Sequence, residues 1–293
     1  MPWIRILSGG VAIAVALLMI ILGGWYFTIG FGIIVYLGQL EVFALTKAKG
    51  INAAVKTTLI VSQVLLISAH IAPPLSDAIL SLAGTCICFY VLFQPKFATI
   101  ADVAASILGL FYGGYLPSYW IRLRNWESDL ANLPLGGYWP TDWSLESLPI
   151  GLIHTLLAFA CIWAADIGAY AAGRTFGRTP LTNISPKKTV EGAICGISGS
   201  FLVGCTGAWL MQWPLWWITG AAFGTMIGVA SLLGDLTESL MKRDAGVKDS
   251  GTLIPGHGGI LDRTDSYVFT APLVFYFITM LLPNLPGAWP GGS

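Results

Sequence analysis

Acidic side chains inside an otherwise apolar segment are the first residues of this chain that could do chemistry. One helical stripe would hold Asp235, Glu238, Ser239 and Lys242, which stand at spacings of three, four and seven. A carboxylate within an apolar helix costs about 2.5–3.5 kcal/mol on membrane-insertion scales, and a bound cation would offset that cost. The alternative is that Asp235 pairs with Lys242 for structure only. We interpret the stretch Ser231–Asp244 as a candidate cation site.

A second acidic cluster follows a glycine-rich turn. Gly258 and Gly259 come directly after His257, and glycines in such a turn let backbone amides point at an anion. Asp262 and Asp265 stand three residues apart where the last apolar segment begins. His257 is either a ligand or orienting group, or a structural histidine, and the sequence leaves both readings open.

A third motif joins an acidic residue in one apolar segment to a basic loop. Asp166 lies within the first segment, Thr189 closes the loop at a helix start, and Glu191 opens the next segment. The loop carries the cations Arg174, Arg178, Lys187 and Lys188. A basic loop that closes on a helix start is suited to binding phosphate. The alternative, cations that only orient membrane segments, explains the charges but not Asp166 or Glu191.

The composition places these motifs in a membrane. The chain has 293 residues, of which 55% are hydrophobic and 10% are charged, and its mean hydropathy is +0.74. Soluble domains carry about a quarter charged residues, so this chain could not cover its surface for water. Residues 166–265 hold 16 of the 30 charges, and residues 266–293 hold none. The five cysteines lie in apolar stretches and are expected to be packing residues.

Nine apolar segments approach the roughly 20 residues that a membrane-crossing helix needs. They are expected at 4–22, 25–45, 56–72, 75–94, 98–121, 149–171, 190–211, 215–238 and 266–283. We therefore predict an all-α, polytopic membrane protein. Its expected parts are N-terminal transmembrane helices at 1–121, a non-cytoplasmic loop at 122–148 with interfacial aromatic residues, and a catalytic transmembrane region at 149–293.

Basic residues orient this arrangement, because they are enriched in cytoplasmic loops. With a cytoplasmic N-terminus and the first apolar run retained as a span, 13 basic residues fall on the cytoplasmic side. Only Arg122 and Arg124 fall on the other side, where they are a misfit. The loops at 173–189 and 242–265 are then cytoplasmic. Nothing in the sequence links Arg5 or Lys49 to the three motifs.

The stretch from Ser239 to Asp265 resembles the signature of the phosphatidate cytidylyltransferase (CDP-diacylglycerol synthase) family. It reads S-L-M-K-R-D-A-G-V-K-D-S-G-T-L-I-P-G-H-G-G-I-L-D-R-T-D, with the family's K-R, K-D, H-G-G and D-R-x-D elements at the expected spacings. Gly234-Asp235 and the run Ser185-Pro-Lys-Lys-Thr match further family features. The resemblance covers roughly residues 160–270 by motif, and the first half of the chain agrees in hydropathy only.

The resemblance implies an integral, multi-pass enzyme that joins CTP to phosphatidic acid, with release of pyrophosphate, on the cytoplasmic side of the inner membrane or its equivalent. It implies a homodimer and no nucleic-acid partner. Mg²⁺ would be held by Asp235 and Asp262, with a second cation left open. The expected catalytic residues are Asp235, Asp262, Lys242 and Arg263. The expected substrate-binding residues are Asp166, Ser185, Lys187, Lys188, Thr189, Glu191, Arg243, Lys248, Asp249, His257, Gly258, Gly259 and Asp265.

Two other functions compete with this reading. A CTP-dependent kinase of a polyprenol-type lipid would share the nucleotide site, but the complete signature favours cytidylyl transfer. Intramembrane acids also mark the ion pathways of transporters. The first five segments carry few acids, Glu41, Asp77 and Asp102, and no inverted repeat is evident. The sequence therefore argues against a transporter.

Overall fold

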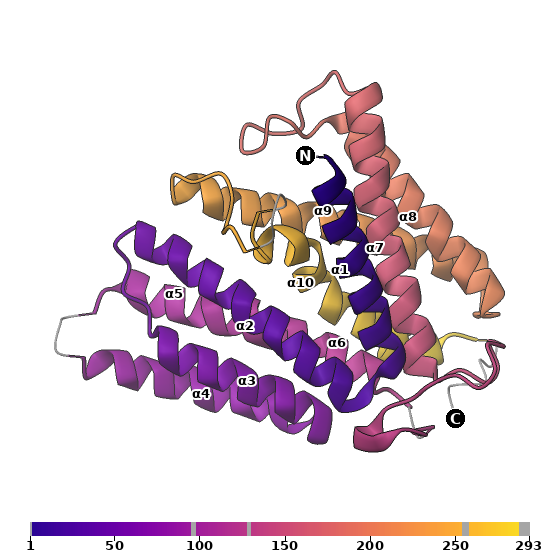
Figure 1. Ribbon diagram of the computed structural model, residues 1–293, viewed down its shortest axis with the longest axis horizontal. Coiled ribbons are helices and arrows are strands. Elements are labelled where there is room, and N and C mark those ends of the chain that lie inside the picture. The colour runs from indigo at the N-terminus through magenta and orange to yellow at the C-terminus, as the bar shows by residue number, and fades with distance from the viewer. Residues whose placement is uncertain (1, 95–97, 128–129, 254–257, 287–293) are drawn as a thin grey trace. The chain divides into compact units, whose positions relative to one another are not determined.

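The computed structural model describes residues 2–94, 98–127, 130–253 and 258–286, with side chains from residue 9 onward (Figure 1). Within these ranges the chain is mainly helical and includes two isolated bridges, Leu133 with Gly137 and Pro180 with Thr189. The chain divides into two compact units. Unit 1 comprises residues 1–125, 130–139 and 240–264, and unit 2 comprises residues 126–129, 140–239 and 265–293.

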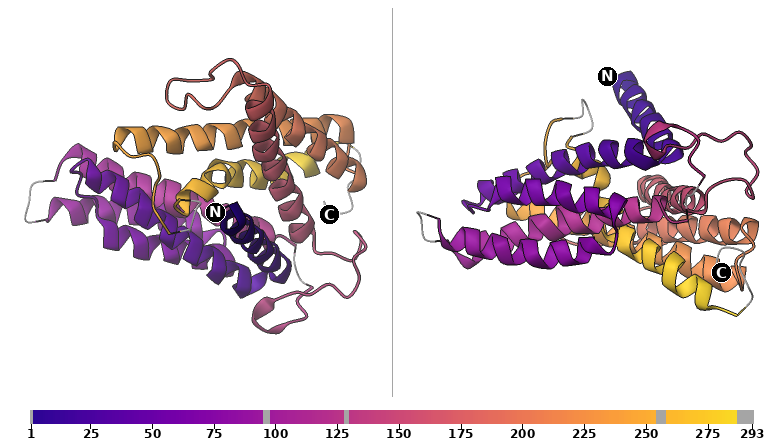
Figure 2. Two further views of the ribbon diagram at one scale, coloured as in Figure 1. Left: turned by 45° about the horizontal axis from the view of Figure 1, so that its top comes forward. Right: turned by 90° about the horizontal axis from the view of Figure 1, so that it is seen from below.

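Unit 1 contains the N-terminal helices. Their bounds are α1 Pro2–Leu22, α2 Gly24–Ala48, α3 Val55–Ile71, α4 Leu75–Leu92, α5 Ile100–Leu110 and α6 Leu116–Arg124, with a π-helical turn, Phe111–Tyr115, between the last two. Helices α2, α3 and α4 run side by side in sequence order (Figures 1 and 2). The short 3₁₀ turn η2, Pro134–Gly136, also belongs to this unit.

Unit 2 contains α7 Ile150–Thr175 and α8 Val190–Leu210, which form an extensive antiparallel pair (Figure 1). Two further helices, α9 Trp216–Asp244 and α10 Leu261–Tyr276, contribute to both units. The division falls between Ser239 and Leu240 in α9, and between Thr264 and Asp265 in α10. A π-helical turn, Phe277–Leu281, and a 3₁₀ turn, Leu282–Asn284, continue α10.

The helices confirm the predicted spans. Seven helical segments of the described chain are long and apolar enough to cross a membrane, and the shorter apolar helices Gly9–Leu22 and Val55–Ile71 coincide with two more predicted spans. Three helices extend beyond the apolar windows: α7 ends at Thr175, α9 ends at Asp244, and α10 begins at Leu261. Both ends of the stretch 242–265, predicted to be loop, are therefore helical. Hydropathy detects the apolar part of a helix and misses its polar ends.

Polar side chains connect the helices inside unit 1. Gln39 of α2 is 1% exposed, and its Nε2 donates to Ser62 Oγ at 2.6 Å and to the Gly109 carbonyl at 2.9 Å. Hydrogen bonds between helices contribute to packing where no water is present. A Cβ added to Gly113, in the π-helical turn, would lie 2.4 Å from the Gln39 side chain. Glycine there allows the turn to approach α2.

The two arginines that disagree with the charge distribution have structural roles in unit 1. Arg122 is 6% exposed, and its Nη2 lies 2.8 Å from Asp77 Oδ1. Arg124 is 1% exposed and donates to the Ile20 and Ile21 carbonyls at the end of α1. Cations favour the carboxyl end of a helix, where carbonyl groups lack helical partners. These contacts account for the positions of Arg122 and Arg124. The positive-inside rule counts charges in loops and takes no account of such contacts.

Candidate active site

Three carboxylates from α9 and α10 meet in unit 2. Oxygen atoms of Asp235, Glu238 and Asp265 all lie within 4.8 Å of one another. Glu238 is 1% exposed and Asp265 is 7% exposed. Like charges at this separation in a buried setting repel, and an oxygen-coordinated cation among them would remove the repulsion. The cluster therefore has the donor type and spacing of a candidate metal site.

Glycine brings the two helices of this cluster together. A Cβ added to Gly234 would lie 2.6 Å from the Asp265 carbonyl oxygen. Because only glycine lacks that atom, Gly234 permits the close approach of α9 to α10 next to Asp235. Asp166 of α7 lies beside α10, because Ser266 Oγ of α10 donates to Asp166 Oδ1 at 3.4 Å.

The basic loop between α7 and α8 supplies a cation to this cluster. Lys188 Nζ lies 2.5 Å from Asp235 Oδ2, and the two side chains are 20% and 38% exposed. The loop is closed by backbone bonds from Leu181 to Lys188 and from Val190 to Thr179. Thr189 caps α8 by accepting from the Gly192 amide at 3.2 Å, which confirms the predicted helix start.

Glu191, in the first turn of α8, holds the other side of the same loop. Its carboxylate accepts from the amides of Arg178 and Thr179 at 3.2 Å and from Thr179 Oγ1 at 2.9 Å. These contacts fix the loop backbone, so Glu191 holds the conformation of the loop at Arg178 and Thr179. Lys187 is exposed, and Ser185 accepts from the Lys188 amide through its carbonyl at 3.0 Å.

A second carboxylate–lysine pair occurs in unit 1. Lys242 Nζ donates to Asp262 Oδ1 at 2.6 Å, and the two side chains are 12% and 10% exposed. The other oxygen of Asp262 accepts from the Gly259 amide at 2.8 Å and from the amide and hydroxyl of Ser250, both at 3.1 Å. Lys242, the Gly259 amide and the Ser250 amide therefore fix the orientation of this carboxylate, and the single proton of the Ser250 hydroxyl is shared between Asp262 and Glu41.

The amides of the glycine turn do face an anion, as the sequence predicts, but that anion belongs to the protein. The Gly259 amide donates to the Asp262 carboxylate at 2.8 Å. The amides of Ile260 and Leu261 each donate to the Glu41 carboxylate at 2.9 Å. Gly258 has φ +84°, a left-handed conformation that favours glycine. His257, a predicted ligand, lies outside the described residues.

The remaining predicted residues are exposed. Lys248, Asp249 and Arg263 are solvent-accessible, as is Arg243, whose Nη1 donates to the Val247 carbonyl at 3.3 Å. Lys49 was expected to be unconnected to the motifs, and that expectation is wrong. Its Nζ lies 3.1 Å from Asp244 Oδ1, at the end of α9. No signal in the sequence points to this pair, because Lys49 and Asp244 are far apart along the chain.

The chain matches the profile of the cytidylyltransferase family over residues 3–281. It is 61% identical over 290 residues to a phosphatidate cytidylyltransferase of Synechocystis, covering 97% of this chain and 99% of the relative. A phosphatidate cytidylyltransferase of Bacillus subtilis is 30% identical, with 94% and 97% covered. The chloroplastic phosphatidate cytidylyltransferase 4 of Arabidopsis thaliana is 39% identical, with 89% and 69% covered.

The chain belongs to the cytidylyltransferase family.

The match confirms the resemblance and extends it over the first half of the chain. Within this cytidylyltransferase chain, the predicted metal pair falls in two units, Asp235 in unit 2 and Asp262 in unit 1, so the pairing itself stays a prediction.

Two acids that contact the predicted site residues were not among the predicted residues. Glu238 was already visible on the stripe with Asp235, whereas Glu41 lies on α2, far from the motifs in sequence, and had no such signal.

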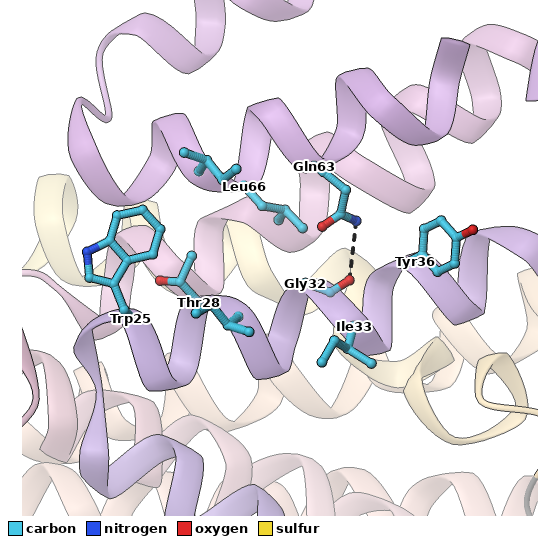
Figure 3. A pocket seen from close by; sticks show the side chains of 9 residues that line it. Trp25, Thr28, Gly32, Ile33, Tyr36, Gln63 and Leu66 are labelled. Atoms are coloured by element: carbon cyan, nitrogen blue, oxygen red, sulfur yellow. Dashed lines mark hydrogen bonds between the residues drawn. The ribbon is translucent and has the colours of Figure 1, made fainter. Parts of the chain in front are cut away.

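A groove in unit 1 is separate from these clusters. It has a volume of about 320 Å³ and lies between α2 and α3, with Trp25 at one end and Tyr36 at the other (Figure 3). Gln63 Nε2 donates to the Gly32 carbonyl across it at 3.2 Å. Its other lining residues are mainly aliphatic, and none belongs to the three motifs. The groove therefore does not enter the candidate site.

Proposed function

We propose that this chain is a phosphatidate cytidylyltransferase, which joins CTP to phosphatidic acid and releases pyrophosphate. The observation that carries the proposal is near full-length similarity, at 61% identity, to a protein of that name. The two carboxylate–lysine pairs support it, because they lie in the motifs where this chemistry requires charged groups. The lipid bilayer is then both the location of the enzyme and the source of its lipid substrate.

The reaction determines what the side chains must do. An oxygen of the lipid phosphate attacks the α-phosphorus of CTP, the bond to the β-phosphate oxygen breaks, and pyrophosphate leaves. Both reactants are anions, so positioning and charge neutralisation dominate the barrier. A phosphate monoester is already largely ionised near pH 7, so no strong general base is required.

Lysines held by carboxylates are suited to this task. Asp235 contacts Lys188 at 2.5 Å, and Asp262 contacts Lys242 at 2.6 Å, so each ammonium group is positioned before a substrate phosphate arrives. Such preorganisation lowers the cost of ordering a long side chain on binding. We assign Lys188 and Lys242 to substrate phosphates, with Lys187, Arg243, Lys248 and Arg263 as further candidate cations.

The acidic residues fit a magnesium ion. The cluster of Asp235, Glu238 and Asp265 offers only oxygen donors within 4.8 Å of one another, which is the donor type that Mg²⁺ prefers. We propose that Asp235 is a magnesium ligand, that Asp262 also contributes, and that Glu238 and Asp265 complete the acidic set or hold a second cation. When bound, the metal would neutralise the triphosphate and stabilise the leaving group. We also propose a homodimer with the site on the cytoplasmic face.

Labelled CTP tests the activity. Purified protein in detergent, given CTP, phosphatidic acid and Mg²⁺, should transfer label from the α-phosphate of CTP to the lipid and release pyrophosphate. Label from the γ-phosphate should stay in pyrophosphate. In a parallel assay with an added polyprenol-type alcohol, transfer of the γ-label to that alcohol, without α-label transfer to phosphatidic acid, would instead identify a lipid kinase and overturn the proposal.

A further inference from the structure

Glu41 is an acid of the N-terminal half that contacts the signature segment directly. It lies on α2, and its Oε1 accepts from the Ile260 amide at 2.9 Å. Its Oε2 accepts from the Leu261 amide at 2.9 Å and from Ser250 Oγ at 2.7 Å. Leu261 is the first residue of α10. Glu41 thus satisfies amides at the start of α10 that have no partner within the helix, and its negative charge is favourable there.

Ser250 connects Glu41 to Asp262. Its hydroxyl lies 2.7 Å from Glu41 Oε2 and 3.1 Å from Asp262 Oδ2, and its amide also donates to Asp262 Oδ2. Ser250 is 7% exposed, so water does not compete freely for these bonds. The orientation of Asp262 therefore depends on Ser250, and that of Ser250 depends on Glu41.

Gly251 and Gly259 leave room for the Glu41 carboxylate because they have no side chain. A Cβ added to Gly251 would lie 2.5 Å from Glu41 Oε1, and one added to Gly259 would lie 2.2 Å from Glu41 Oε2. Both distances are shorter than any real contact to a Cβ atom allows. A side chain at either position would displace the Glu41 carboxylate, and one at Gly259 would also displace the Ser250 hydroxyl.

We infer that Glu41 is a positioning residue for Asp262, a role that rests on the function proposed above. Glu41 binds Ser250 and the amides of Ile260 and Leu261, and so fixes the position of these residues at the start of α10. The Asp262 carboxylate is thereby held in its orientation toward Lys242. The N-terminal half thereby supplies a residue on which the geometry of the signature depends.

The substitution Glu41→Gln tests the inference, because glutamine keeps the length but has one acceptor oxygen and adds N–H donors facing the amide donors. We expect kcat to fall by about tenfold or more, and the Mg²⁺ concentration for half-maximal activity to rise. Amide hydrogen exchange in residues 258–264 should accelerate about tenfold, a readout that does not depend on activity. Because both changes disturb the same contacts, Glu41→Gln and Ser250→Ala should be less than additive in kcat.

Gln39→Leu is the matched control. Gln39 lies two residues away on the same helix and is buried, but it bonds to Ser62 and Gly109 and not to the signature. It should lower thermal stability while leaving kcat of the folded enzyme within about threefold and exchange at 258–264 unchanged. If Glu41→Gln fails to fold, Ser250→Ala keeps the backbone contacts of Glu41 and carries the same expectations.

Two outcomes would overturn the inference: a kcat for Glu41→Gln within about threefold of wild type, or equal losses in Glu41→Gln and Gln39→Leu that follow the folded fraction. Failure of the wild-type protein to transfer α-label would refute the proposed function instead. Even in that case, unchanged hydrogen exchange at 258–264 in Glu41→Gln would overturn the positioning role of Glu41.

Discussion

At the scale of single residues, each aspartate predicted to bind a cation has a lysine beside it. Asp235 has Lys188, and Asp262 has Lys242. Removing one member of such a pair leaves the other charge partly buried, which costs more than the pair itself contributes. Substitutions here therefore need a measure of folding beside every measure of activity.

Asp235→Asn and Asp262→Asn should each reduce activity to less than about a tenth of wild type, a barrier increase of at least about 1.4 kcal/mol. Asparagine keeps the shape but removes the charge that a cation or lysine requires. The measurement is the rate of α-label transfer by protein that elutes as a folded species in detergent. Asp142→Asn is the control, because Asp142 is exposed and bonds only within its own loop. Substantial activity in either motif variant would remove that aspartate from the essential set.

Lys188→Ala and Arg263→Ala should lower kcat/KM by about 10- to 150-fold, which corresponds to the loss of one charge-assisted hydrogen bond of roughly 1.5–3 kcal/mol. Steady-state rates at varied CTP and lipid concentrations check this. Lys49 cannot serve as the control, because it pairs with Asp244. Lys56 is exposed at the start of α3, and Lys56→Ala should stay within about threefold of wild type. Equal, small effects at all three positions would leave no case for phosphate binding by these cations.

At the scale of helices, small residues decide how closely the spans of unit 2 approach. A Cβ added to Gly196 of α8 would lie 2.6 Å from the Ala165 carbonyl of α7, and one added to Gly224 of α9 would lie 2.3 Å from the Ser200 carbonyl of α8. Ser200 Oγ also donates to the Gly224 carbonyl at 2.7 Å. Membrane helices lack the hydrophobic driving force of water, so such contacts hold them together.

Gly224→Ala should destabilise the protein by about 1–3 kcal/mol, because the added methyl group must push α8 and α9 apart. Thermal unfolding in detergent would report this as a fall in Tm. Gly10→Ala is the matched control, since nothing lies within 4 Å of a Cβ at Gly10 of α1. Alanine there should leave Tm unchanged or raise it slightly, because alanine favours the helix. A Tm for Gly224→Ala at or above the wild-type value would contradict close packing at this position.

At the scale of the whole molecule, the charge distribution predicts orientation. The 13 basic residues assigned to the cytoplasmic side contrast with Arg122 and Arg124, and those two are buried and paired within unit 1. Their burial removes them from the loop charges that the positive-inside rule counts. The predicted orientation is thereby internally consistent, and it places the loops at 173–189 and 242–265 on one side.

Cysteine labelling tests that orientation. In a variant without the five native cysteines, Asn183→Cys and Thr252→Cys place exposed thiols in the two motif loops, and Thr141→Cys places one in the loop at 122–148. A membrane-impermeant maleimide added to intact cells should label only Thr141→Cys. Labelling of all three after permeabilisation is the control for thiol reactivity. Labelling of Asn183→Cys or Thr252→Cys from outside would reverse the topology.

The apolar spans, the residue types of the predicted site and the family all follow from the amino-acid sequence alone. Hydropathy is a local property, so helices α2, α3, α4 and α8 begin and end close to the predicted positions, and the stripe from Asp235 to Lys242 follows from helical spacing alone. The single span predicted at 98–121 is divided between α5 and α6 by a π-helical turn. The polar ends of α7, α9 and α10 were missed because a helix can continue after its apolar part ends.

Which distant residues come into contact depends on how the helices pack. Asp265 joins Asp235 and Glu238 because Gly234 lets α9 approach α10, and Lys188 reaches Asp235 from a loop closed by backbone bonds and contacted by Glu191. Glu41 contacts the signature turn although about 200 residues separate them, a distance along the chain that no local pattern spans. Burial of charge makes such partners necessary, but the fold alone selects which distant residue supplies them.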